Sequence, residues 1–248
     1  MPELDGALIA ALAIVTLAGL IFGLTGFGFA LVSVPVLLLV YDPATVVMLT
    51  LVLTLFTCAM VLFDAWRWLR LPVVLAMLPG AVLGLIGGSY VLLLASADTI
   101  KLIAGAVVVL FSALMLGGFR LPGAGHRLAP PVAGGASGLL ATSTGLSSPP
   151  AVMLLAARNE PRDTFRANIT AYFIVINLAG LLALAAQGLL TSQQAVVSAT
   201  LLPPTLLGTL AGAWLSRFVP PPLFRRITLV LLLATGVIGF VTAATALL

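Results

Sequence analysis

Long apolar runs, separated by short polar or charged stretches, make up most of the chain. An apolar run of about 18 or more residues is long enough to cross the hydrocarbon core of a bilayer as a helix. The candidate spans are residues 6–24, 44–63, 71–95, 99–118, 129–144, 164–186, 193–215 and 223–247. Two further runs, about 29–40 and 149–157, are too short to cross alone. No alternation of polar and apolar residues marks lipid-exposed strands, so the pattern predicts an all-α polytopic membrane protein.

The composition and the charge of the chain agree with this interpretation. Of 248 residues, 62% are hydrophobic and 7% are charged, whereas a soluble domain carries about 25% charged residues. The formal net charge of +4 comes from cations that flank the apolar runs, which favours a role in topology over a nucleic-acid partner. The opening MPELDGALIA lacks the basic start of a secretory signal, so the first run is expected to remain as a helix. Cys58 stands alone, so no disulfide, metal site or cofactor is predicted.

Three short patterns recur in the same order in the two halves of the chain. The matched pairs are GLIFGLTGFG with GLLATSTGLS (19–28 and 138–147), YDPATV with NEPRDTF (41–46 and 159–165), and PGAVLGLIGG with PTLLGTLAG (79–88 and 204–212). A single match of this kind is weak, but three in one order indicate duplication. We therefore predict two homologous transmembrane repeats, residues 1–120 and 121–248, within one membrane domain.

The charged connectors change places between the halves, which indicates opposite orientations in the membrane. Within the first half the arginines lie in the connector 64–70, whereas within the second half they lie in 158–166 and 216–226, and 187–194 carries no charge. Arg120 and Arg127 lie between the halves. With every arginine inside, ten cations are cytoplasmic and Lys101 is outside, in agreement with the positive-inside rule. Each inverted repeat then needs three spanning helices plus a broken or re-entrant hairpin. Both termini are expected on the outer side of the inner membrane.

Two short polar stretches interrupt apolar helices at equivalent places in the repeats. They are Thr25, Gly26, Phe27 and Gly28 in the first half, and Thr144, Gly145, Leu146, Ser147 and Ser148 in the second. Non-helical backbone at membrane depth occurs only where protein or a wet cavity surrounds it. The N–H groups that start the next helix carry the positive end of its dipole and suit an anion. Pro149 and Pro150 fit the first turn of that helix, and Ser147 and Ser148 are expected to cap it, so both stretches are candidate substrate sites.

A second set of candidates consists of polar residues on two equivalent long helices. Its members are Thr50, Thr54, Asn168 and Tyr172. Two interpretations are open, because these side chains could face the substrate path or the threonine hydroxyls could bond back to their own helix. Glycines spaced by four at positions 80, 84 and 88 are expected instead to serve close helix packing.

The charged and nucleophilic residues give no sign of an enzyme. No acidic or basic side chain lies in the middle of a predicted span, and no nucleophile with a base, paired carboxylates or metal spacing is found. His126 lies in a loop and is expected to be solvated, and the cytoplasmic arginines are expected to be exposed and to concentrate anions at the inner mouth. A lipid-modifying membrane enzyme, a non-transporting subunit of a complex and a channel stay open as alternatives to a transporter.

These motifs resemble the sulfite exporter TauE/SafE family of membrane permeases. The resemblance rests on GLIFGLTGFGFALVSVP and PGAVLGLIGG with their echoes GLLATSTGLSSPP and PPTLLGTLAG, and it covers almost the whole chain. It implies transport of small sulfur-containing anions such as sulfite, sulfonates or sulfoacetate, often as export, with an anion site near residues 25–28 and 144–148. Phe29, Ser147, Ser148 and Pro149 depart from the glycine-rich family pattern. The departure leaves the anion open, and the coupling ion, proton or sodium, is open as well.

Overall fold

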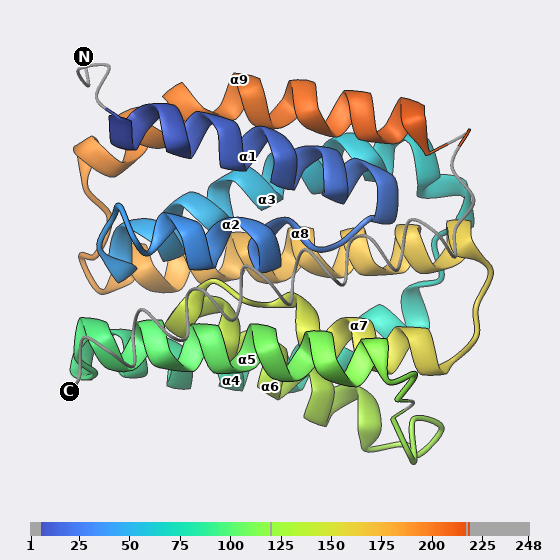
Figure 1. The fold of residues 1–248 in the computed structure, drawn as a ribbon. Coiled ribbons are helices and arrows are strands. Elements are labelled where there is room, and N and C mark those ends of the chain that lie inside the picture. The colour runs from blue at the N-terminus through green and yellow to red at the C-terminus, as the bar shows by residue number, and fades with distance from the viewer. Residues whose placement is uncertain (1–5, 120, 217, 219–248) are drawn as a thin grey trace.

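The computed structural model describes residues 6–119, 121–216 and 218, and in these residues all regular structure is helical (Figure 1). The elements are α1 (Gly6–Thr25), α2 (Phe29–Leu37), α3 (Pro43–Ala65), the 3-10 helix η1 (Trp66–Trp68), α4 (Leu71–Leu94), α5 (Ala97–Leu116), α6 (Ala129–Thr144), α7 (Ser148–Ala157), α8 (Arg162–Ala186) and α9 (Ser192–Leu215). The all-α prediction is confirmed for this part of the chain. The predicted span 223–247 and the C-terminus lie outside the described residues.

Six of the described helices, α1, α3, α4, α5, α8 and α9, are long and apolar enough to cross a membrane, so this is a multi-pass membrane protein. The 9 residues of α2 and the 10 of α7 reach only about 14 and 15 Å, half of the hydrocarbon core. The candidate run 129–144, for which the sequence leaves a span or a re-entrant hairpin open, is too short to cross alone. The corresponding helix, α6, has 16 residues and reaches about 24 Å before Gly145 ends it and the chain turns back.

Polar caps start three of the long helices. The Thr45 N–H donates to Asp42 Oδ1 (3.0 Å) at the start of α3, and the Thr99 N–H donates to Ser96 Oγ (3.2 Å) at the start of α5. A capping box between Thr191 and Gln194 starts α9. Because each cap satisfies a backbone donor that the helix itself cannot, it fixes where the apolar segment begins.

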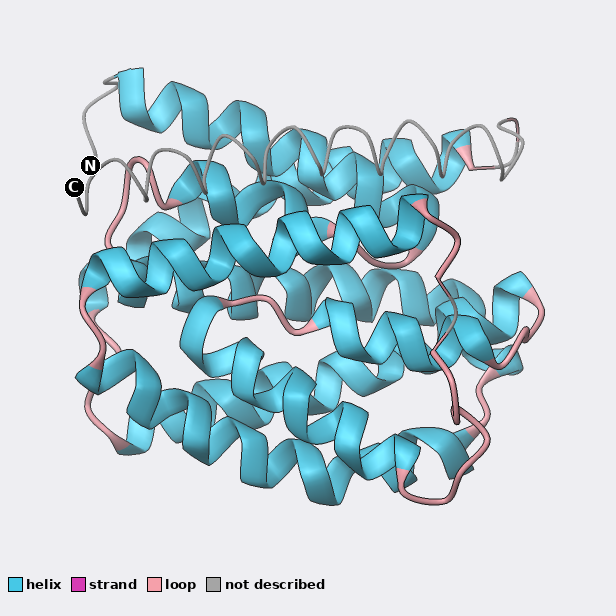
Figure 2. Ribbon diagram, turned by 60° about the horizontal axis from the view of Figure 1, so that its bottom comes forward, coloured by secondary structure: helices cyan, strands magenta, loops and turns pink. Residues whose placement is uncertain are grey.

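The short helices pair with their neighbours as antiparallel hairpins (Figures 1 and 2). The chain enters along α1, turns back along α2 and leaves at the end of the bundle where α1 began. α6 and α7 make the same kind of hairpin from the opposite end, and the loop between them lies among the other helices. Each hairpin therefore begins and ends at the same end of the bundle.

Glycines bring two helix pairs into backbone contact. A Cβ at Gly84 or Gly88 of α4 would collide with the carbonyl oxygens of Gly135 or Leu139 on α6, so α4 and α6 touch main chain to main chain. The expectation that these glycines serve close packing is confirmed.

The second helix pair, α1 with α9, repeats this arrangement. Gly208 and Gly212 of α9 meet the carbonyls of Thr16 and Leu20 on α1 as Gly84 and Gly88 meet those of α6. Each glycine of α9 lies 124 residues after its counterpart in α4, and each contacted residue of α6 lies 119 residues after its counterpart in α1. The contacts of one half thus have counterparts at constant offsets in the other.

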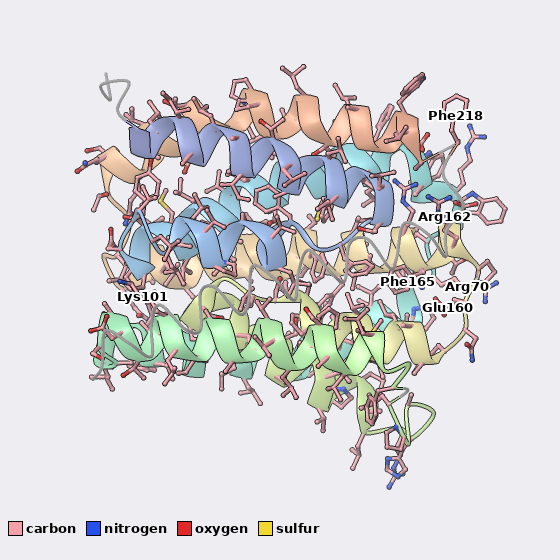
Figure 3. All side chains as sticks on the ribbon, in the orientation of Figure 1. Arg70, Lys101, Glu160, Arg162, Phe165 and Phe218 are labelled. Atoms are coloured by element: carbon pink, nitrogen blue, oxygen red, sulfur yellow. The ribbon has the colours of Figure 1, made fainter. Side chains whose placement is uncertain are left out.

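The charged side chains separate toward the two ends of the bundle. Figure 3 shows Arg70, Glu160 and Arg162 at one end and Lys101 at the other. We call the first the arginine-rich end; besides Arg70 and Arg162, its arginines are Arg67, Arg127, Arg158 and Arg166. Arg120, Arg217, Arg225 and Arg226 lie outside the described residues. At the opposite end, Lys101 forms an ion pair with Asp98 (3.9 Å).

Candidate substrate site at two helix breaks

The first break, residues 25–28, joins α1 to α2. Gly26 has a φ of +81° and Gly28 a φ of +95°, in the left-handed region that favours glycine, and the Gly26 N–H donates to Phe22 O (2.7 Å) to close the last turn of α1. The Thr25 hydroxyl oxygen lies 2.8 Å from Ile21 O and accepts the Phe27 N–H (3.2 Å). Thr25 therefore bonds the end of the helix to the backbone that leaves it.

The second break, residues 144–148, joins α6 to α7 with the same construction. Gly145 has a φ of +81°, and its N–H donates to Ala141 O (3.1 Å). The Thr144 hydroxyl donates to Leu140 O (2.9 Å) and accepts the Leu146 N–H (3.4 Å). The breaks differ at the residue that precedes each short helix. Gly28 has a left-handed backbone, whereas the equivalent Ser147 has a φ of −67°.

The two short helices start without a side-chain cap, which corrects the sequence expectation for the serines. Gly28 precedes α2 and Ser147 precedes α7, and neither makes a capping bond. An N-cap hydroxyl accepts the N–H of the second or third helical residue. In α7 these residues are Pro149 and Pro150, which have no N–H to give. The placement of both prolines in the first turn of α7 is confirmed.

The donors that remain differ between the breaks. The first three N–H groups of α2 have no acceptor within their helix, so the first break presents backbone donors. In the second break the prolines have no N–H to offer. Ser148, however, is only 3% exposed, and its hydroxyl has no hydrogen-bond partner. One break thus offers N–H groups and the other a buried, unpaired O–H.

Each break packs against a long helix of the opposite half. A Cβ on Gly145 would stand 3.3 Å from Thr50 Cβ and Oγ1 on α3 and 3.4 Å from Val34 Cγ2 on α2. Residues 144–148 are all buried, as are Gly26 and Gly28. The non-helical backbone is therefore enclosed by protein, as its depth in a membrane requires.

The residue of α8 that lies on the first break is Arg166. A Cβ on Gly26 would stand 3.1 Å from its Cγ, and Arg166 is 8% exposed. The expectation of an exposed arginine is therefore wrong for Arg166, although Arg158 and Arg162 are exposed. The available signal was its position inside the predicted span 164–186, one helical turn beyond Arg162.

A comparison with models of known protein families assigns the chain to one of them. The profile of the family described as sulfite exporter TauE/SafE matches residues 11–238, nearly its whole length. The chain belongs to the sulfite exporter TauE/SafE family. No curated protein and no solved structure matched. TauE/SafE is a family of membrane transporters for sulfur-containing anions, so membership indicates a membrane transporter.

Three of the four other polar candidates of this TauE/SafE protein have hydrogen-bond partners of their own. Asn168 accepts the Arg70 backbone N–H (2.8 Å) and donates to Glu160 Oε2 (2.8 Å), so it ties two connectors to α8 at the arginine-rich end. The Tyr172 hydroxyl reaches Gly134 O on α6 (3.5 Å), and Thr50 bonds Val46 O (2.7 Å). The Thr54 hydroxyl is buried without a partner.

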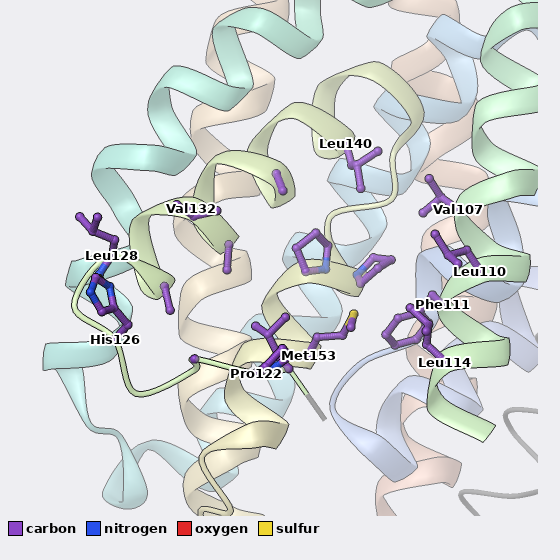
Figure 4. A pocket seen from close by; sticks show the side chains of 17 residues that line it. Val107, Leu110, Phe111, Leu114, Pro122, His126, Leu128, Val132, Leu140 and Met153 are labelled. Carbon is purple, nitrogen blue, oxygen red and sulfur yellow. The ribbon is translucent and has the colours of Figure 1, made fainter. Parts of the chain in front are cut away.

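A separate apolar cavity of about 530 Å³ lies between α5, α6 and α7 (Figure 4). Phe111, Leu140 and Met153 line it, and Pro149 and Pro150 form its wall beside the second break. His126, at its rim, is exposed as expected. Because side chains of this kind donate no hydrogen bonds to an anion, the cavity does not suit the substrate class of a TauE/SafE transporter.

Proposed function

We propose that this protein is a secondary transporter that moves a small sulfur oxyanion, of the sulfite, sulfonate or sulfoacetate type, across the inner membrane by alternating access. The proposal rests on one observation in particular, the two equivalent buried breaks in a chain of the TauE/SafE family. A desolvated oxyanion needs hydrogen-bond donors. The start of α2 and the Ser148 hydroxyl are donors without partners in their own helices.

The proposed arrangement of the protein is two inverted repeats, residues 1–120 and 121–248. The hairpins that enter from opposite ends and the glycine contacts at constant offsets support it. With the arginine-rich end in the cytoplasm, α1 starts outside. Export is the proposed direction, because an anion that leaves an inside-negative cell gains about 2.3 kcal/mol per charge per 100 mV.

The test is transport by purified protein in liposomes under an imposed membrane potential. The anions are sulfite, sulfate, thiosulfate, sulfoacetate, taurine and acetate. Ser148→Ala removes a buried hydroxyl that has no partner, and Ser112→Ala does the same on α5, so the second variant controls for burial. Gly145→Leu obstructs the second break, and Gly87→Leu is its control because a Cβ at Gly87 meets nothing within 4 Å.

We expect saturable flux of one sulfur oxyanion that falls about tenfold or more in Ser148→Ala, because a hydrogen bond to a charged group is lost, and that Gly145→Leu abolishes. Both controls should transport like the wild type. A flux that is unchanged in all four variants would show that the substrate site lies elsewhere than at the breaks. Non-saturating conduction would indicate a channel, and absence of flux from folded protein would favour the enzyme or the subunit of a complex.

A further inference from the structure

Arg166 is a buried cation that lies on the first break. It is the fifth residue of α8, one turn inside the arginine-rich end, and 92% of its surface is covered. Its aliphatic stem lies against Gly26, with Cγ at 3.1 Å from where a Cβ would stand. Beside it, Phe27 of the break and Phe165 of α8 pack edge to face, with ring centroids 6.0 Å apart. Arg166 thus packs against Gly26, and the next residue on each side of this contact joins the break to α8 as well.

The guanidinium of Arg166 has an unused donor. Its Nη2 donates to Gly23 O in the last turn of α1 (2.9 Å), and its Nε is buried without any partner. Arg162 binds the next carbonyl, Leu24 O (3.1 Å), and also Ser216 O beyond α9 (3.4 Å). Two arginines therefore hold the carbonyl end of α1, where the helix dipole is negative, and the inner one keeps an N–H free.

The charge of Arg166 has no counterion in the described part of the chain. Among the described residues, the one ion pair shorter than 4.0 Å joins Lys101 and Asp98 at the other end of the bundle. No described carboxylate therefore lies within 4.0 Å of the Arg166 guanidinium. Asp64 and Asp163 act on Arg166 only from a longer distance. A buried cation without a counterion is costly, and in membrane proteins such a residue usually marks a functional site.

We propose that the Arg166 guanidinium binds the transported oxyanion at the first break, with the free N–H groups at the start of α2 on its other side. This inference rests on the transport function proposed above and names its charged ligand-binding residue. A guanidinium presents several N–H donors in a fixed plane and matches two oxygens of one anion, which an ammonium cannot do. The bound anion supplies the counterion that the described residues lack.

Two substitutions and one control test this assignment. Arg166→Gln removes the charge, Arg166→Lys keeps the charge without the planar fork, and Arg158→Gln neutralises an exposed arginine at the same end. The readouts are sulfite-dependent thermal stabilisation of the purified protein, which gives a Kd, and sulfite flux in liposomes. We expect the Kd to rise about 10- to 100-fold in Arg166→Gln and less in Arg166→Lys, with Arg158→Gln like the wild type. Without sulfite, Arg166→Gln removes a buried charge that lacks a counterion and also loses the hydrogen bond to Gly23 O. The two effects oppose each other, so we expect little change in the melting temperature.

Each result decides the assignment. A wild-type Kd and flux in Arg166→Gln would overturn it and leave the transport function standing. A lower melting temperature without sulfite, together with an unchanged Kd, would make Arg166 purely structural. If Arg166→Gln does not fold, Arg166→Lys decides, since a Kd equal to that of the wild type would exclude a guanidinium contact. Wild-type protein that neither transports nor binds sulfite or the other anions would refute the proposed function itself.

Discussion

The contact between α4 and α6 makes a sharp prediction for single alanine substitutions. At Gly84 an added methyl group would overlap the Gly135 carbonyl oxygen, whereas at Gly87, on the same helix, it would meet nothing within 4 Å. A backbone oxygen in a helix cannot move aside as a flexible side chain can, so the Gly84→Ala helices must separate. Overpacking of this kind costs about 1–3 kcal/mol.

The expected readout is the melting temperature of the detergent-purified protein, followed by tryptophan fluorescence and checked by size-exclusion chromatography. For a chain of this size about 2–4 °C accompanies each kcal/mol, so Gly84→Ala should melt about 2–12 °C lower. Gly87→Ala should melt at or slightly above the wild type, because alanine is the better helix former by up to about 1 kcal/mol.

The repeat relation adds a second variant to this test. Gly208 of α9 meets the Thr16 carbonyl as Gly84 meets that of Gly135, so Gly208→Ala should lower the melting temperature by a similar amount. Equal melting of Gly84→Ala and Gly87→Ala would refute the argument that backbone contact holds this pair of helices. A loss in Gly84→Ala without one in Gly208→Ala would refute the equivalence of the two pairs.

Two further predictions concern the breaks and the topology. Thr25→Val and Thr144→Val each remove a hydroxyl that joins helix and break, so each should destabilise the protein by about 1–3 kcal/mol. Serine at either position should restore most of the lost stability. A loss of stability at only one of the two breaks would contradict their shared construction. In a Cys58→Ala background, an impermeant maleimide added outside intact cells should label Lys101→Cys but not Arg67→Cys, and the reverse pattern would invert the proposed orientation.

The breaks could be found from the sequence because their determinants are local. In both breaks a threonine followed by a left-handed glycine stands at the end of an apolar run, where the threonine hydroxyl bonds the last turn and the glycine lets the chain leave the helix. The same local reasoning could have avoided the capping error, since Pro149 and Pro150 leave Ser147 no N–H to accept.

The burial of Arg166 could not be found in this way, because it depends on a distant segment. The carbonyl end of α1, more than 140 residues earlier, packs over the second turn of α8 and covers the guanidinium. Asn168 shows the same limit. Its place on a polar stripe suggested a substrate contact, but the connectors that carry Arg70 and Glu160 fold back and use its amide.

The contacts at the breaks also link the two halves of the molecule. Gly145 of the second half rests on Thr50 of α3, and Gly26 of the first half rests on Arg166 of α8. Since α3 and α8 pack on each other, a shift of one against the other alters both breaks at once. Close-packed interfaces change between discrete arrangements and do not deform continuously. If the proposed anion draws Arg166 away from the α1 carbonyls, it therefore acts on the second break too, and the proposed alternating access around one site requires coupling of this kind.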